Sequence, residues 1–299
     1  MSEEGNVSFI EHLSELRLRL VKCAIAIAIC FVVAWIFRGD LLFILKKPLM
    51  DALPGDMHNI VLLRIVDKFF IHLKISLMGG IFLSSPVLFF QLWRFVAPGL
   101  YKSEKRYVLP FVVFSVFFFS AGVAFCYFLI LPFGFDFLVK YSIDSGQVLF
   151  GEALSDAAVP AAAVGDLLQI SLREHISFTG TLLLVFGVAF ETPLFIFLLS
   201  STGLVSAAWF AKQRKYAVVI AFFMAAILTP PDPWTQSALA LPLILLYEIG
   251  IWSTRLLLIW KKDKTDEIDD DDENENGNAE SEGEPHEDRS DDSPSSGKQ

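Results

Sequence analysis

Carboxylates placed beside or inside long apolar runs are the side chains in this sequence most able to do chemistry. Glu15 lies in the stretch from Phe9 to Leu20, FIEHLSELRLRL, directly before the first apolar run. Glu191 sits well inside the fourth run, where an ionised side chain facing lipid would cost about 2.5–3.5 kcal/mol. Glu15 can therefore form ion pairs at an aqueous surface, whereas Glu191 must face a cavity, a partner or a proton.

The segment around Glu15 has the pattern of a short amphipathic helix. Apolar residues spaced four, three and four apart share one helical face, namely Phe9, Leu13, Leu16 and Leu20. Glu11, Glu15 and Arg19 lie four apart on another face, and Ser8 with Glu11 forms a capping box that predicts the helix start. Such a helix would lie against a membrane or a partner. From this segment alone, an exposed Glu15 paired with Arg19 contributes only about 0.2–0.5 kcal/mol and requires no function.

Residues near two of the apolar runs also stand out. Pro193, two residues after Glu191, should loosen the helix that carries both residues. The simpler alternative to a functional Glu191 is a neutral side chain that is hydrogen-bonded within the helix bundle. In Thr229 to Gln236, TPPDPWTQ, Asp232 is expected to cap the last helix with Pro233 in its first turn, which leaves Gln236 unexplained.

Two further glutamates have ordinary explanations. Glu248 is either a second acid within the membrane or an interfacial residue near Arg255. Glu104 lies among three bases in APGLYKSEKRY at 97–107, where a loop glutamate is usually a solvated charge.

The elements that must position these groups are transmembrane helices. Hydrophobic residues make up 54% of the chain and the mean hydropathy is positive, which is typical of a polytopic membrane protein. The chain carries −10 and residues 263–299, with sixteen Asp or Glu against three Lys or Arg, carry −13, which leaves +3 for the first 262 residues. The acidic tail has almost no apolar residues and is expected to be disordered.

Six apolar runs predict an all-α fold with six spans, the fifth unusually short. They are Val21 to Phe37, Ile75 to Val96, Val108 to Leu131, Ile176 to Leu199, Tyr216 to Leu228, and Thr235 to Trp252. Six spans place both termini on one side. With the N-terminus inside, the inner flanks hold fourteen Lys or Arg against eight outside, so the positive-inside rule favours N-in and C-in. The predicted parts are the amphipathic helix at 1–20, the membrane domain at 21–256 and the tail at 257–299.

Enzyme signatures are missing from the sequence. It contains no GxSxG, HExxH or GxxxxGK, and its five histidines lack metal-ligand spacing, so no catalytic residue, metal or cofactor is expected. No basic folded domain suggests nucleic-acid binding. Its three cysteines, Cys23, Cys30 and Cys126, lie in apolar runs and are expected to be packing residues.

Four segments resemble the TatC family, the multispanning core subunit of the twin-arginine protein translocase. They are HLSELRLRL at 12–20, FVAPGLYKSEKR at 95–106, FGVAFETPL at 186–194 and the long stretch from RKYAVV to YEIGI at 214–251. The resemblance covers about residues 8–256. It implies six helices in a cupped, glove-like shape, with short fifth and sixth helices, in the bacterial cytoplasmic (inner) membrane. A second outer loop at roughly 140–176 that is longer than usual, and the charged REH at 173–175, depart from the family pattern.

The resemblance also implies site residues. Glu15 and Glu104 match the two carboxylates that read paired arginines of a signal peptide, Phe95 matches an aromatic beside them, and Arg17 and Arg19 are expected to position Glu15. A guanidinium fork meets a carboxylate with two parallel bonds, whereas lysine is a point charge, so such a site can distinguish Arg-Arg from Lys-Lys. Further matches are Glu191 and Tyr127, in the third span, for an intramembrane cavity, Asp232 and Gln236 for docking single-span subunits, and Pro48 in the first outer loop.

The resulting hypothesis is a non-enzymatic receptor for folded cargo bearing twin-arginine signal peptides. The family implies single-span TatA-type and TatB-type partners, assembly with further copies of the same chain, contact with the lipid bilayer and energy from the proton-motive force. The alternative is a proton-coupled transporter of small solutes that uses Glu191 and Asp232, although no internal repeat supports it. An intramembrane hydrolase lacks a nucleophile and base.

Overall fold

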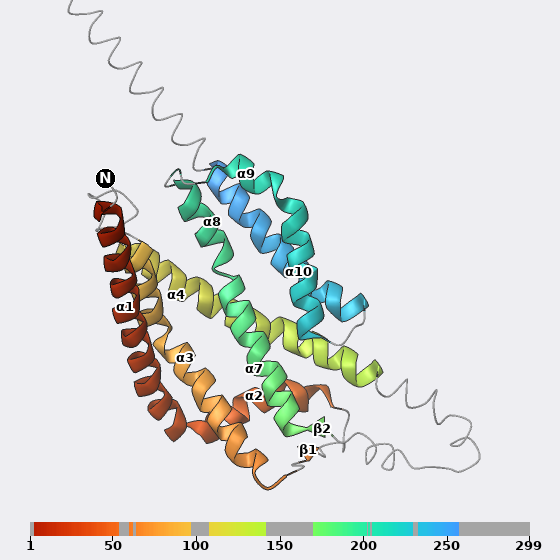
Figure 1. The fold of residues 1–299 in the computed structure, drawn as a ribbon. Coiled ribbons are helices and arrows are strands. Elements are labelled where there is room, and N and C mark those ends of the chain that lie inside the picture. Colours follow the sequence, from red (N-terminus) through yellow and green to blue (C-terminus); the bar gives the residue numbers. More distant parts are fainter. Residues whose placement is uncertain are drawn as a thin grey trace, which may run out of the picture.

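The computed structural model describes residues 3–53, 60–61, 64–96, 108–141, 170–201, 203, 205–229 and 233–256. The described chain is almost entirely helical (Figure 1). Its elements are α1 (Glu3–Ile36), α2 (Arg38–Ala52), β1 (Ile60–Val61), α3 (Asp67–Val96), α4 (Val108–Phe125), the π-helix η3 (Cys126–Ile130), β2 (Ile170–Ser171), α7 (Leu172–Ala189), α8 (Thr192–Ser201), α9 (Ala207–Lys212) and α10 (Arg214–Leu228). Helical residues 131–141 continue η3, and Pro233–Leu256 forms the last helix.

Five helical stretches among the described residues are long and apolar enough to cross a membrane. They are Leu13–Ile36, Asp67–Phe95, Leu109–Tyr141, Leu172–Ser201 and Pro233–Leu256. Each includes all, or all but one residue, of a predicted apolar run. A chain in lipid must satisfy its backbone hydrogen bonds internally, which a helix does. The remaining predicted run corresponds to α10, whose 15 residues span only about 22 Å. Five described helical stretches are therefore candidate spans, and α10 is the short element predicted from the sequence.

The helix that carries Glu15 is longer than predicted. The capping box placed its start at Ser8, and the predicted boundary between amphipathic helix and membrane domain fell after Leu20. The expected start at Ser8 is wrong, because α1 begins at Glu3 and continues without interruption to Ile36, and the predicted boundary falls inside this one helix. No proline interrupts this stretch, and a nucleated helix propagates readily through residues such as Leu, Arg and Ala. Side chains before Leu13, including those of Ser8 and Glu11, lie outside the described part.

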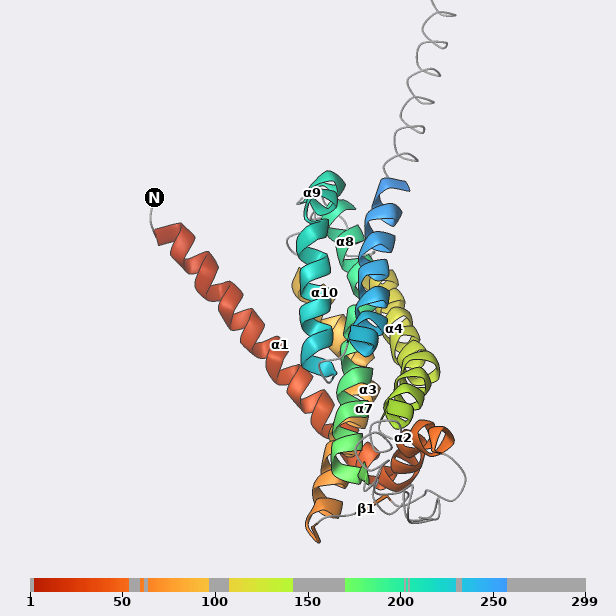
Figure 2. The same cartoon turned by 90° about the vertical axis from the view of Figure 1, so that its right-hand side faces the viewer.

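Helix α1 packs along α3 and leaves the remaining helices to one side. Glycine allows a close approach here, since a Cβ on Gly80 would lie 2.9 Å from the backbone nitrogen of Phe31. Figure 2 shows α1 leaning away from α10 and the last helix toward its N-terminus, so its leucines at that end are not covered by them. The beginning of α1, the end of α3, α9 and the end of the last helix all lie at one end of the molecule, termed the N-terminal end (Figure 1).

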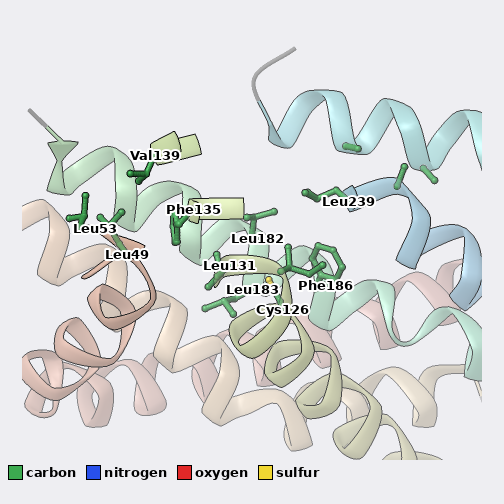
Figure 3. Packing of buried hydrophobic residues seen from close by; sticks show 14 residues of the cluster. Leu49, Leu53, Cys126, Leu131, Phe135, Val139, Leu182, Leu183, Phe186 and Leu239 are labelled. Atoms are coloured by element: carbon green, nitrogen blue, oxygen red, sulfur yellow. The ribbon is translucent and has the colours of Figure 1, made fainter. Parts of the chain in front are cut away.

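The largest buried cluster joins the third and fourth long helices to α2 and the last helix. Figure 3 shows Cys126 and Leu131 facing Leu182 and Phe186 of α7, with Leu239 at one edge. Cys126 is fully buried, as expected of a packing residue, and the three cysteines are free. This cluster holds the centre of the bundle together and fixes how α7 lies against the π-helical segment.

The opposite end, termed the far end, is held by polar contacts between segments distant in sequence. Strands β1 and β2 pair in parallel, with Ile60 opposite Ile170 and Val61 opposite Ser171. Arg173 binds the buried Asp67 at 3.2 Å, and the Nε2 atom of His175 lies 3.1 Å from the carbonyl oxygen of Leu45. The charged REH segment that departs from the family pattern therefore connects α2, α3 and α7. Residues 142–169 of the long second loop, and the tail after 256, lie outside the described part.

Candidate functional site

Glu15 occupies the N-terminal end of α1 as one member of an ion pair. Arg19 binds its Oε1 atom through Nη2, and also through Nε at 3.2 Å, so the predicted i, i+4 pair is confirmed. The exposed fractions differ, because the Arg19 side chain is 11% exposed and that of Glu15 is 40% exposed. Arg19 is thus the covered member, and the carboxylate faces outward on the surface of the helix.

The leucines around Glu15 are not covered by the described part of the chain. Leu13, Leu16 and Leu20 are 49%, 41% and 68% exposed. An apolar face of this kind is stabilised by lipid or by a partner rather than by the chain's own core. The predicted amphipathic pattern is therefore present, although it forms the first turns of a longer helix.

Two other residues expected at this site lie at the same end of the molecule. Phe95 is half-buried near the end of α3, and Arg17 is exposed on α1. Glu104, the second carboxylate, lies outside the described residues, so its distance from Glu15 is not part of the structure. The described residues thus supply one carboxylate, on Glu15, and its cation, on Arg19. The aromatic Phe95 lies at the same end of the molecule, near the end of α3.

Glu191 lies at the break between α7 and α8, where sequence analysis expected Pro193 to loosen the helix. Residues 190 and 191 form a turn, in which the Glu191 amide donates to the Val188 carbonyl at 3.0 Å before α8 begins at Thr192. A proline in the first turn of α8 cannot donate a backbone hydrogen bond, so the regular ladder ends here. The prediction of a loosened helix is confirmed.

The Glu191 carboxyl group is buried in the bundle with polar neighbours on α4. Its Oε1 atom is buried and has no hydrogen-bond partner among the described residues. The Ser115 side chain and the Phe119 backbone lie within hydrogen-bonding range of the carboxyl group. Ser115, itself fully buried, accepts a hydrogen bond of 2.7 Å from the indole nitrogen of Trp93 on α3. Three helices therefore contribute to one polar chain inside the bundle.

Sequence analysis missed Ser115 and Trp93 as neighbours of Glu191. The available signal was a serine within the run FVVFSVFFF, where a hydroxyl group needs a partner. Such a signal identifies the residue but not its partner, because Trp93 is 22 positions earlier.

Tyr127 contacts α2 in the described part of the chain. Tyr127 is the second residue of η3, and its hydroxyl donates to the carbonyl of Ile44 in α2 at 2.9 Å. With Pro48 and Asp51 it lines a cavity of about 370 Å³ toward the far end. Ser115 and Tyr127 are twelve residues apart on one helical stretch, or about 18 Å. Tyr127 thus lies beside α2 and Pro48, and its grouping with Glu191 stays a prediction.

The residues expected to dock partner subunits are only partly described. The Gln236 side-chain amide donates to the carbonyl of Phe222 in α10 at 3.2 Å, which ties the last helix to α10. The last helix begins at Pro233, as expected, whereas Asp232 lies outside the described residues. Glu248 binds Arg214, a residue 34 positions away at the start of α10, at 2.8 Å, and it lines one cavity with Arg255.

Comparison with known proteins agrees with this arrangement. The family model described as Sec-independent protein translocase protein (TatC) matches residues 11–242. The chain belongs to the TatC family. A curated TatC protein from Desulforapulum autotrophicum is 42% identical over 265 residues, covering 89% of this chain and 90% of the relative. The TatC protein of Escherichia coli K12 is 35% identical over 255 residues, covering 85% and 91%.

Solved TatC structures have the same fold. A crystal structure of the twin arginine translocase receptor TatC is 36% identical to this chain, with a TM-score of 0.68, and the match covers 82% of this chain and 98% of that one. A second, of the same receptor in DDM, is 37% identical with a TM-score of 0.69 and covers 81% and 99%. The resemblance to the TatC family noted in the sequence is confirmed, and the all-helical membrane fold with it.

Proposed function

We propose that this chain is the core receptor subunit of a twin-arginine protein translocase in the bacterial inner membrane. It is a transport component and not an enzyme, in keeping with its family and its membrane-spanning helices. In this proposal it binds the paired arginines of signal peptides on folded cargo and nucleates the export complex. The proton-motive force supplies the energy.

The observation that carries the proposal is the outward-facing Glu15 on a helix whose leucines are uncovered. A signal peptide offers arginines followed by an apolar segment, and this surface offers a carboxylate beside exposed Leu13 and Leu16. The present partner of Glu15 is itself a guanidinium, on Arg19, which supports arginine as a ligand of this carboxylate. Glu104 would supply the second carboxylate, with Phe95 beside it and Arg17 and Arg19 positioning Glu15.

The proposed topology has six spans with both termini in the cytoplasm. Helix α10 would be the short fifth span, and the bilayer would thin locally to accommodate about 22 Å of helix. The N-terminal end of the molecule would then face the cytoplasm, and the distribution of Lys and Arg in the sequence supports this orientation.

The proposed route for cargo leads from Glu15 toward Glu191. A buried carboxyl oxygen without a partner supports a role for Glu191 inside the hollow of the cup. Single-span TatA-type and TatB-type subunits would dock at the α10 and last-helix region, where Gln236 already joins two helices and Asp232 lies beside it in sequence. Further copies of this chain would complete the assembly.

Photo-crosslinking of a signal peptide tests the receptor assignment. An Arg-Arg peptide should label wild-type protein strongly, and Glu15→Ala and Glu104→Ala should each reduce labelling by about tenfold or more, the loss expected for one charge-assisted pair worth 1.5–3 kcal/mol. A Lys-Lys peptide should label all of these proteins weakly. Glu174→Ala serves as the matched control, because Glu174 is an exposed glutamate at the far end. Equal labelling across all proteins and both peptides would falsify the assignment.

Glu191 is also the one observation that favours a proton-coupled transporter of small solutes. Buried acids at broken helices are typical of such carriers. Vesicles containing only this chain distinguish the two functions: the receptor takes up no solute with or without Glu191→Gln, whereas a carrier would show uptake that the variant abolishes.

A further inference from the structure

Two adjoining cavities form a groove along the last helix. The first, of about 360 Å³, lies between α4, α8 and the last helix and is lined by Phe111, Phe114 and Phe118 on one side and Pro193 and Phe197 on another. The second, of about 640 Å³, continues toward the N-terminal end and is lined in the described part of the chain by the last helix, including Trp252, Arg255 and Leu256. Ile249 and Ser253 line both cavities, so the two adjoin along the last helix.

The first cavity has the length and character of an acyl-chain site. Its α4 lining runs from Pro110 to Phe118, eight residues or about 12 Å of helix. One leaflet of a bilayer is about 15 Å of hydrocarbon, half of the 30 Å core. The lining is aromatic, aliphatic and proline, with only Ser253 as a polar side chain, and the Ser253 hydroxyl already donates to the Gly250 carbonyl at 2.8 Å.

The side chains that line this cavity favour a lipid chain over another helix. Close helix pairs use small residues at the contact. The first cavity is lined by the bulky side chains of Phe114 and Phe197 instead.

The second cavity ends in a cation that has no carboxylate partner among the described residues. Arg255 is exposed there, while the nearby Glu248 is already neutralised by Arg214 at 2.8 Å. Trp252, 70% exposed, lies on the same wall, and tryptophan favours the level of lipid headgroups. The groove is thus apolar in its depth and cationic at its mouth.

We propose that this groove binds an anionic phospholipid, with one acyl chain between α4 and α8 and the phosphate at Arg255. An arginine binds phosphate oxygens through its planar fork, so an anionic headgroup complements this end, whereas the interior holds hydrocarbon. The site lies outside the residues assigned to signal-peptide reading and to partner docking. Its lipid would fill the wedge between α4, α8 and the last helix and hold these elements at a fixed separation.

Native mass spectrometry of the purified full chain tests the site. Phosphatidylglycerol and phosphatidylcholine of equal chain length are added in separate series, and wild type should retain phosphatidylglycerol preferentially. Arg255→Gln should lower phosphatidylglycerol retention about tenfold, toward the phosphatidylcholine level, as expected on losing one charge-assisted contact. Arg94→Gln, which removes an exposed arginine at the same end on α3, should leave retention unchanged.

A second pair of variants tests the apolar part of the groove. Ile249→Trp fills the point where the cavities join and should reduce retention of both lipids, whereas Val219→Trp on the exposed side of α10 should not. Retention unaffected by both Arg255→Gln and Ile249→Trp would overturn the proposal, as would equal retention of the two lipids by wild type. A photo-reactive residue at 249 in native membranes should form lipid adducts, and an adduct with a single-span protein instead would assign the groove to a partner helix.

Discussion

At the scale of single residues, the buried polar chain from Trp93 through Ser115 to Glu191 is the least ordinary feature of the bundle. Each member comes from a different helical segment, and only the Trp93 donor and the Ser115 hydroxyl form a complete hydrogen bond, at 2.7 Å. Glu191 keeps one buried oxygen without a partner. A buried polar group without a hydrogen bond costs more free energy than a satisfied one contributes. This series of polar side chains therefore lowers the stability of the fold at Glu191 and raises it at Trp93.

The Trp93 to Ser115 bond should contribute measurably to stability. Ser115→Ala leaves a buried indole N–H without an acceptor and should lower the free energy of unfolding by about 0.6–1.7 kcal/mol, the range for hydrogen bonds between membrane helices. Unfolding by SDS in mixed micelles measures this. The double variant Trp93→Phe with Ser115→Ala should lose less than the sum of the single losses, and strict additivity would contradict a direct bond.

Glu191 should be a residue that lowers stability in favour of function. Glu191→Leu removes the unsatisfied oxygen and should raise the free energy of unfolding by about 1–3 kcal/mol, while Ser115 keeps its bond to Trp93. The same variant should reduce export of folded cargo in cells, since the proposed hollow loses its polar group. Glu191→Gln is the control, expected to change stability less. Lower stability of Glu191→Leu would show that the carboxyl group is satisfied in the membrane.

Local pairs could be predicted at this scale, and distant ones could not. The spacing of Glu15 and Arg19 follows from helical periodicity, which one sequence displays. Arg214 with Glu248 and Arg173 with Asp67 are 34 and 106 positions apart, and nothing in hydropathy relates such residues.

At the scale of elements, glycine determines how closely α4 and α7 approach. A Cβ on Gly122 would lie 2.6 Å from the carbonyl oxygen of Phe186, and one on Gly187 would lie 2.6 Å from the ring of Phe119. Both contacts adjoin the segment that carries Glu191. The position of the helix break therefore depends on these two small residues.

Replacing one of these glycines should separate the helices. Gly122→Ala places a methyl group against backbone that cannot move independently, and overpacking of this kind costs about 1–3 kcal/mol. Gly134→Ala is the matched control on the same helical stretch, because its Cβ would meet nothing within 4 Å and alanine favours helix by about 0.5–1 kcal/mol. Opposite shifts of the SDS unfolding midpoint are expected, and equal shifts would contradict the close contact.

The sequence predicted where helices lie better than where they end. Apolar runs report only the part of a helix in hydrocarbon, so the run from Ile176 to Leu199 became Leu172–Ser201 and the run from Val108 to Leu131 became Leu109–Tyr141. The π-helix at Cys126–Ile130 leaves no trace in hydropathy, since it changes hydrogen bonding rather than composition. Pro193 did predict the break at Glu191, because its missing N–H removes a hydrogen bond from the adjacent helical turn.

At the scale of the whole molecule, the class and the helical bundle followed from composition, whereas the grouping of residues required the fold. Glu15, Phe95 and Glu191 could be singled out from the sequence, but the sequence also grouped Tyr127 with Glu191. Tyr127 contacts Ile44 and His175 contacts Leu45, and these two contacts position helix α2. Helix α2 thus lies beside Tyr127. A turn of the chain at Phe37 that folds α2 back on the bundle is a tertiary event with no periodic signal.

The orientation of the whole chain depends on whether the 15 residues of α10 cross the bilayer. Single cysteines in a chain with Cys23, Cys30 and Cys126 replaced by alanine decide this, using a membrane-impermeant maleimide on intact cells and on inverted vesicles. Ser14→Cys and Gly39→Cys are references for the two ends of α1. Lys212→Cys precedes α10, and Trp234→Cys follows it at an exposed position.

If α10 is the fifth of six spans, Lys212→Cys should react from the same side as Ser14→Cys, and Trp234→Cys from the side of Gly39→Cys. With α10 lying in one leaflet, positions 212 and 234 would react from the same side, and the two termini would be on opposite sides. The first outcome is expected because the end of α8, α9 and the end of the last helix all lie at the N-terminal end, while α10 leads away from it (Figure 2). Arg214 at the start of α10 binds Glu248 at 2.8 Å, and a short span flanked by such polar residues can be accommodated by local thinning of the bilayer.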